Sequence, residues 1–227
     1  MAWPLLLAVE GLLAGPGDLV PEIVTPAVEA AWEEHHREAG LSGDAADVPC
    51  TPFADELVLC LRVLEGPASR PVTTADLADW RNPFPEARNQ AVQHIIQGLG
   101  PGRPEQVRVE GDARSYFLSA QGDGYDQAGL FDPDALARRA GGPIAVGIPA
   151  RGVFIAFLLD DPELARIVAV GVRRAFETLP EPITDVLYTW NGQVWIPWGR
   201  SRPADEGAIV PPSPAQNPAV APTGSPP

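Results

Sequence analysis

The fold is decided by residues 132–163, which read DPDALARRAGGPIAVGIPARGVFIAFLLDDPE. Segments 132–134 and 161–163 share one helix-start pattern: an Asp that can cap the helix, a proline at the first helical position and an acid in the first turn. Two apolar runs, 144–148 and 153–159, lie between these starts and are joined by a Pro-Ala-Arg-Gly turn. Because both runs are apolar throughout, we predict central strands covered by helices.

Further strands are predicted on both sides of this stretch. Residues 114–121 contain the strand-like run Ser-Tyr-Phe-Leu before a glycine-rich turn. Residues 185–190 and 193–198 flank an Asn-Gly pair at 191–192. That pair predicts a two-residue type I′ hairpin, because both turn positions need a positive φ.

The region before this unit contains one predicted strand and two predicted helices. Residues 56–64 are apolar with β-branched members and predict a strand. Thr73 and Asp76 have the spacing of a capping box, which predicts the start of a short helix. A longer helix is predicted over residues 86–99, where apolar side chains recur at helical spacing before a Gly-Pro-Gly stop.

Residues 19–39 also predict a helix. Their apolar side chains recur at intervals of three and four residues, and their charges lie on the other face. Pro21 is tolerable in a first turn, whereas Pro26 would kink or restart the helix. Residues 40–49 are rich in Gly, Asp and Ala and predict a loop or linker.

Together these elements predict an α+β protein with a mainly antiparallel sheet covered by helices. We expect the six strands to lie in one sheet and residues 114–198 to form a compact strand–helix–hairpin–helix–hairpin unit. The chain divides into an N-terminal helical segment with a linker (1–49), an α+β domain (50–200) and a disordered proline-rich tail (201–227). The tail has no aromatic residue, and its prolines favour polyproline conformations.

The charge balance excludes several classes of partner. The chain has 30 acids against 16 bases and a net charge of −14, so we expect neither nucleic acid nor an anionic membrane as a partner. A basic protein surface would be attracted instead. All the bases are arginine, so the chain cannot use a catalytic or phosphate-binding lysine.

The cysteines and the apolar runs point to the cytoplasm. Cys50 and Cys60 are too few for a disulfide framework and lack zinc-site spacing, and Cys60 is expected to pack as a small apolar side chain. The apolar start, residues 3–9, has no basic region before it and is interrupted by Glu10. No run reaches the roughly 20 apolar residues of a membrane helix.

The sequence contains no recognisable catalytic or metal-binding motif. Glu33 and His36 share a helix face at the spacing of some metal sites, but a second pair is missing, so a solvated helix end is the favoured interpretation. We find no Gly-x-Ser-x-Gly elbow, P-loop or cysteine–histidine signature. We therefore predict no catalytic residue, no metal and no cofactor.

One polar set lies in turns at strand ends, where folds usually present functional groups. Its members are Asp123, Tyr125, Asp126 and Arg151. If Arg151 pairs with Asp126, the set is structural and ties two turns together. The alternative is a small polar binding site formed by the same turns, with Arg151 binding a carboxylate through two hydrogen bonds.

Several phrases resemble a bacterial family of uncharacterised proteins, the YtpQ-like family. The matching segments are residues 56–64, 71–80, 123–130 and 148–154 together with the helix around Ala91, so the likeness covers roughly residues 50–198. Family members tend to carry an Asn in that helix, where this chain has Ala91. The resemblance implies an α+β fold in an intracellular bacterial setting, and it implies no activity.

Two hypotheses for the function follow. The first is a non-enzymatic intracellular binding protein, such as an adaptor, an immunity protein or a chaperone-like module, which recognises another protein. It is favoured by the acidic composition and the missing catalytic signatures. The alternative is an enzyme of unrecognised type, which requires Asp123, Asp126 and Arg151 to converge in one pocket.

Overall fold

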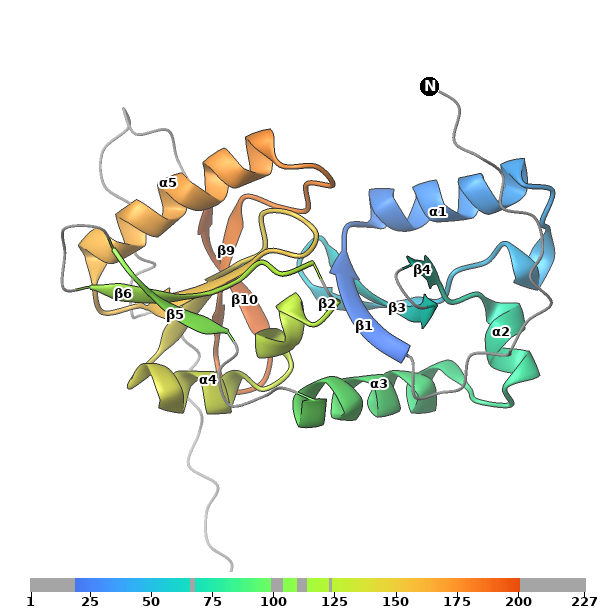
Figure 1. Cartoon of the computed structure of the whole chain (residues 1–227), viewed down its shortest axis with the longest axis horizontal. Helices are drawn as coiled ribbons and strands as arrows, with labels where there is room; N and C mark the ends of the chain where they lie inside the picture. Colours follow the sequence, from blue (N-terminus) through green and yellow to red (C-terminus); the bar gives the residue numbers. More distant parts are fainter. Residues whose placement is uncertain (1–18, 66–67, 99–103, 110–113, 123, 201–227) are drawn as a thin grey trace, which may run out of the picture.

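Two antiparallel sheets lie side by side, each between helices (Figure 1). The computed structural model describes residues 19–65, 68–98, 104–109, 114–122 and 124–200. We call the sheet ordered β1-β3-β2, with β4 also paired to β3, the N-terminal sheet. The sheet ordered β10-β9-β7-β8-β6-β5 is the C-terminal sheet. The predicted α+β class is confirmed. Residues 1–18, Asp123 and the predicted disordered tail lie outside the described residues.

The C-terminal sheet contains the strands predicted for residues 114–198 and one more at its edge. Its strands are β5 (Glu105–Arg108), β6 (Ser115–Ser119), β7 (Ile144–Gly147), β8 (Phe154–Leu158), β9 (Val186–Trp190) and β10 (Trp195–Arg200). As predicted, β7 and β8 are central. Their side chains alternate between two cores: Val146 and Phe154 face α4 (Pro133–Ala140), whereas Ala145 and Phe157 face α5 (Pro162–Thr178).

The predicted helix starts form as expected. Asp132 accepts a hydrogen bond from the backbone N–H of Ala135, and Asp161 accepts one from Leu164. Thr73 and Asp76 form the capping box of α2 (Thr74–Asp79). These caps satisfy N–H groups that the first helical turn leaves without partners.

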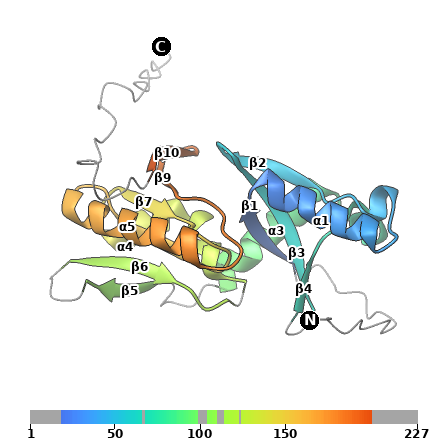
Figure 2. The same ribbon diagram turned by 90° about the horizontal axis from the view of Figure 1, so that it is seen from above.

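The N-terminal sheet is covered on its two faces by different helices (Figure 2). Its strands are β1 (Leu19–Val24), β2 (Cys50–Ala54), β3 (Leu57–Glu65) and β4 (Ala68–Pro71). One face packs on α2 and α3 (Phe84–Gly98) through Leu61 and Val63 and joins the core of the C-terminal sheet through Leu57 and Leu59. The other face lies under α1 (Pro26–Glu38).

The helix predicted over residues 19–39 is wrong for its first part. Residues 19–24 form β1, whose side chains are all buried, and Pro26 starts α1 instead of kinking a longer helix. Apolar spacing allowed both structures, and pairing along the whole of β1 with β3 selected the strand. Residues 40–49 contain the 3₁₀-helix η2 (Gly43–Ala45). The N-terminal sheet has strands on both sides of the domain boundary expected between residues 49 and 50.

The single sheet expected for all the strands is also wrong. The predicted strand 56–64 is β3, and it pairs with β1, β2 and β4 rather than with any strand of the C-terminal sheet. The sequence pattern marks strands but not their neighbours, because long-range pairing depends on residues far apart in the chain. The partners that the prediction lacked are short strands: β1, β2 and β4 pair with β3, and β5 pairs with β6.

The turn after β9 also differs from its prediction. Trp190 pairs with Trp195, so four residues connect the strands instead of two. The Asn191 side chain accepts hydrogen bonds from the N–H groups of Gln193 and Val194, and in this turn Gly192 alone has a positive φ. This Asx-type turn replaces the predicted type I′ turn because the Asn side chain competes for the backbone donors.

Cys50 and Cys60 form a disulfide across β2 and β3. Cys60 is fully buried, as expected for a small apolar side chain, but it is not a free thiol. The expectation failed because the two cysteines lie ten residues apart and only the hairpin register places them opposite each other.

Candidate functional site

Asp126 closes a turn through partners of its own and does not pair with Arg151. It begins the 3₁₀-helix η3 (Asp126–Leu130), and its buried carboxylate accepts hydrogen bonds from the Ser119 hydroxyl and the N–H groups of Gln121 and Gly122, each at 2.8 Å. Three donors of the same turn therefore occupy this carboxylate. Asp126 is therefore structural, but it stabilises its own turn and does not form the ion pair with Arg151 that one interpretation of the sequence required.

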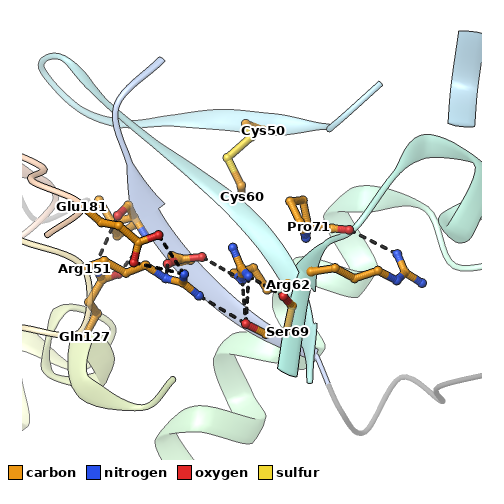
Figure 3. Close-up of polar contacts among 11 residues, drawn as sticks. Cys50, Cys60, Arg62, Ser69, Pro71, Gln127, Arg151 and Glu181 are labelled. Carbon is orange, nitrogen blue, oxygen red and sulfur yellow. Dashed lines mark hydrogen bonds and ion pairs between the residues drawn. A yellow bond between two sulfur atoms is a disulfide. The ribbon is translucent and has the colours of Figure 1, made fainter. Parts of the chain in front are cut away.

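Arg151 binds residues from three other parts of the chain (Figure 3). Its Nε lies 2.6 Å from Glu22 Oε1, and a terminal nitrogen lies 3.2 Å from Glu181. The other terminal nitrogen donates to Ser69 Oγ at 3.2 Å. The structure therefore brings Arg151 to the N-terminal sheet, and the ion pair with Asp126 does not form.

The backbones of the two predicted turns nevertheless meet. Gly152 has φ of +70°, and a Cβ placed there would lie 3.5 Å from Asp126 Oδ2 and from Gly122 Cα. A side chain at this position would be strained by the backbone conformation. The turns thus touch through glycine while the side chains of Asp126 and Arg151 point to different partners.

Tyr125 contacts a residue outside the predicted set. Its hydroxyl lies 3.2 Å from Nε2 of His94 on α3, and the two rings are 6.2 Å apart. This contact joins the turn before η3 to the helix under the N-terminal sheet. Of the four predicted site residues, the structure therefore describes Tyr125, Asp126 and Arg151, and it gives each of them a different partner.

The ion network contains two buried charges that sequence reasoning missed. Glu22 and Arg62 lie 3.2 Å apart, and their side chains are 9% and 8% exposed. Burial raises the pKa of Glu22, although Arg62 and Arg151 oppose that change. Burial likewise lowers the pKa of Arg62. Desolvation therefore outweighs attraction at both groups, as expected for ion pairs taken out of water.

Strand register explains why these charges meet. Glu22 on β1 lies opposite Cys60, and Val20 lies opposite Arg62, so all of these side chains share the sheet face under α1. Arg62 then donates to the hydroxyl and the carbonyl of Ser69 on β4. The Trp32 ring of α1 covers the guanidinium at 5.3 Å, a distance at which cation–π attraction contributes.

The edge of the N-terminal sheet is closed by a glutamine side chain. Gln127 accepts a hydrogen bond from the Ile23 N–H at 2.7 Å and donates one to the Ile23 carbonyl at 3.3 Å. Its amide thus imitates one residue of a neighbouring strand. An edge strand otherwise exposes such groups to unwanted pairing, and this contact ties β1 to η3.

The network holds the two sheets together without leaving a surplus charge. Glu22 and Glu181 balance Arg62 and Arg151, and Ser69 accepts hydrogen bonds from both arginines. A balanced set has no excess positive charge for an anion. The sequence contains one sign of this network: a charged residue lies inside each of the apolar strands LVPEIV and LVLCLRVLE.

Carboxylates crowd a second region, on α1 and the loop that follows it. We call Glu29, Glu33, Glu34, Glu38, Asp44 and Asp47 the acidic surface. The pKa of Glu29 is raised by burial and by the nearby charges of Glu33 and Asp47. Among the described residues, no group of three or more His, Cys, Asp and Glu side chains is placed to hold a metal ion.

The predicted pair Glu33 and His36 serves the local fold. Glu33 accepts a hydrogen bond from the Val48 N–H and forms an ion pair with Arg37, and His36 Nδ1 lies 3.3 Å from the Ala46 carbonyl. Both side chains therefore fasten α1 to the segment that leads into β2.

Comparison with known proteins identifies no relative: no family model, curated protein or solved structure matches this chain. The likeness to the YtpQ-like family therefore stays a prediction. Within the described part of the chain, none of the helices has the length and apolar character needed to cross a membrane.

Proposed function

We propose that this chain is a non-enzymatic binding protein whose acidic surface recognises a basic region of another protein. The observation that carries the proposal is the crowding of like charges on α1. Glu29 and Glu33, and likewise Glu34 and Glu38, are spaced four residues apart, an arrangement that destabilises an isolated helix when the charges are alike.

Little positive charge compensates this crowding. Arg37 is the only arginine between Pro21 and Leu61, and it pairs with Glu33 and Glu34. A negative face attracts positively charged partners. A basic protein surface is therefore the class of partner that best complements this region.

The enzyme alternative receives less support. It requires Asp123, Asp126 and Arg151 to converge, and the two of these residues that the structure describes are occupied by separate sets of partners. No further observation on the described residues favours a reaction at these turns.

The proposal is tested by neutralising charges in matched pairs. Glu34→Gln with Glu38→Gln removes two exposed charges from the acidic surface, and Glu163→Gln with Glu177→Gln removes two from α5. Glu34 and Glu163 each pair with an arginine three residues later, and Glu177 also pairs with Arg173, so the α5 variant loses at least as many ion pairs as the α1 variant. Tagged wild-type and variant proteins are used to capture partners from a native lysate, and each captured protein is then titrated at several salt concentrations.

We expect the α1 variant to lose affinity for its basic partner about tenfold at low salt, and the α5 variant to bind like the wild type. Added salt should remove the difference. Equal binding by both variants, or affinity that does not change with salt, would contradict the proposal.

A further inference from the structure

The disulfide joins two neighbouring strands of the N-terminal sheet. Cys50 and Cys60 lie directly opposite each other on β2 and β3, with their Cα atoms 4.4 Å apart (Figure 3). Cys60 is fully buried on the central strand, and Cys50 is half-buried on the outer strand. An incoming reagent therefore reaches the pair from the Cys50 side.

We propose that Cys50 and Cys60 form a reversible thiol–disulfide exchange site that controls how firmly β2 is attached to the N-terminal sheet. The substrates are small thiols and their disulfides. This inference does not depend on the proposed binding function, because it concerns the state of one strand.

The exchange proceeds in two balanced steps. A thiolate attacks Cys50 Sγ, forms a mixed disulfide there and releases the Cys60 sulfur, which takes up a proton. A second thiolate then attacks the sulfur of the bound reagent, so that Cys50 is also released as a thiol. Two reagent thiols become one reagent disulfide, and the protein disulfide becomes two protein thiols. The reverse reaction restores the bond.

The sheet itself makes the reverse reaction easy. The β2–β3 register places the cysteines opposite each other by backbone pairing, so the reduced residues remain neighbours without a search by the chain. These are the only two cysteines in the sequence, so no wrong pairing within one chain competes.

The backbone pairing of the strand attached by this bond is short and irregular. β2 pairs with β3 over a few residues, its register shifts between Pro52 and Ala54, and Pro52 has no N–H to donate. Phe53 of β2 packs edge-on against Phe131, which follows η3, at 6.1 Å between ring centres. Loosening β2 would therefore also loosen its contact with the segment that follows η3.

The test uses the full chain under native conditions. Protein is equilibrated with glutathione and glutathione disulfide at a series of ratios, free thiols are tagged and counted by mass spectrometry, and amide hydrogen exchange is measured at both ends of the series. The double variant Cys50→Ser with Cys60→Ser provides a form that cannot make the bond.

We expect stepwise conversion between zero and two free thiols that reverses when the ratio is restored. Amides of β2 should exchange at least about tenfold faster in the reduced protein and in the double variant, while those of β7 and β8 keep their protection. The proposal is overturned if the bond resists reduction until denaturant is added, or if reduction exposes the amides of the whole chain.

Discussion

The buried ion network allows a sharp test in which a second substitution should rescue the first. Arg62→Met removes one of the two guanidinium groups that contact Glu22 and keeps an unbranched side chain of comparable length beneath Trp32. Glu22 then stays buried with Arg151, at 2.6 Å, as its remaining cation. We expect a loss of about 3 kcal/mol in the free energy of unfolding, the lower end of the range for breaking a buried pair.

Glu22→Gln alone leaves the buried Arg62 guanidinium without its carboxylate, so it should also cost about 3 kcal/mol. When the two substitutions are combined, the unpaired charge disappears. The double variant should therefore recover about 2 kcal/mol relative to Arg62→Met alone. Urea unfolding followed by tryptophan fluorescence measures all four proteins, and Arg166→Met, which removes an exposed pair with Glu163, is the control.

The pH dependence has a definite sign. The pKa of Glu22 is raised in the folded protein, so its contribution to stability is fully present below its ordinary value of 4.5 and is lost as pH rises through the folded pKa. Arg62→Met should steepen this loss, and Glu22→Gln should abolish it. If the losses of the single variants simply add in the double variant, or if the pH slope is unchanged, the interpretation of this network is refuted.

Three further predictions concern other contacts. Gln127→Leu should lower the free energy of unfolding by about 2 kcal/mol, because the N–H and carbonyl of Ile23 lose their partners. Urea unfolding measures this loss, and a loss near zero would show that water replaces the amide. Gly129→Ala should cost about 2 kcal/mol through overpacking, because its Cβ would lie 2.8 Å from the Phe154 ring, and an unchanged melting temperature would contradict the packing. Burial opposes ionisation of Asp76, but hydrogen bonds from an arginine and from the N-cap threonine hold its pKa below 3.8. Its contribution is therefore present above pH 3.8 and lost as pH falls through the folded pKa, so Asp76→Asn should flatten the acid limb of stability against pH; an acid limb identical to that of the wild type would contradict this assignment.

Local signals predicted the C-terminal sheet well. The caps at Asp132 and Asp161 and the apolar runs between them lie within a few residues of the groups they organise, so their effect does not depend on distant parts of the chain. The same holds for the capping box at Thr73. Two features were missed there: the edge strand β5, and the length of the last hairpin turn, where the Asn191 side chain binds the turn itself.

The candidate site was predictable only in part. Arg151 was recognised as a polar residue on a turn, with two open interpretations: an ion pair with Asp126, or a binding site formed by the same turns. Its actual partners include Glu22 on β1, more than a hundred residues away in the chain. No pattern of neighbouring residues predicts a partner so far away in the chain. The lone Glu within LVPEIV is a sign of a buried charge that needs a partner, but it does not say which one.

Residues close together in the sequence determine the type and the ends of most helices and strands, because capping, turn formation and apolar alternation act over a few positions. Tertiary structure decided which strands pair, whether residues 19–24 form a strand, and which charges meet. Apolar spacing in residues 19–24 is compatible with a helix or a strand, and the free backbone groups of β3 selected the strand. That choice placed Glu22 beside Arg62 and within reach of Arg151 and brought Ile23 to Gln127, so the contacts that join the two sheets exist only in the folded chain.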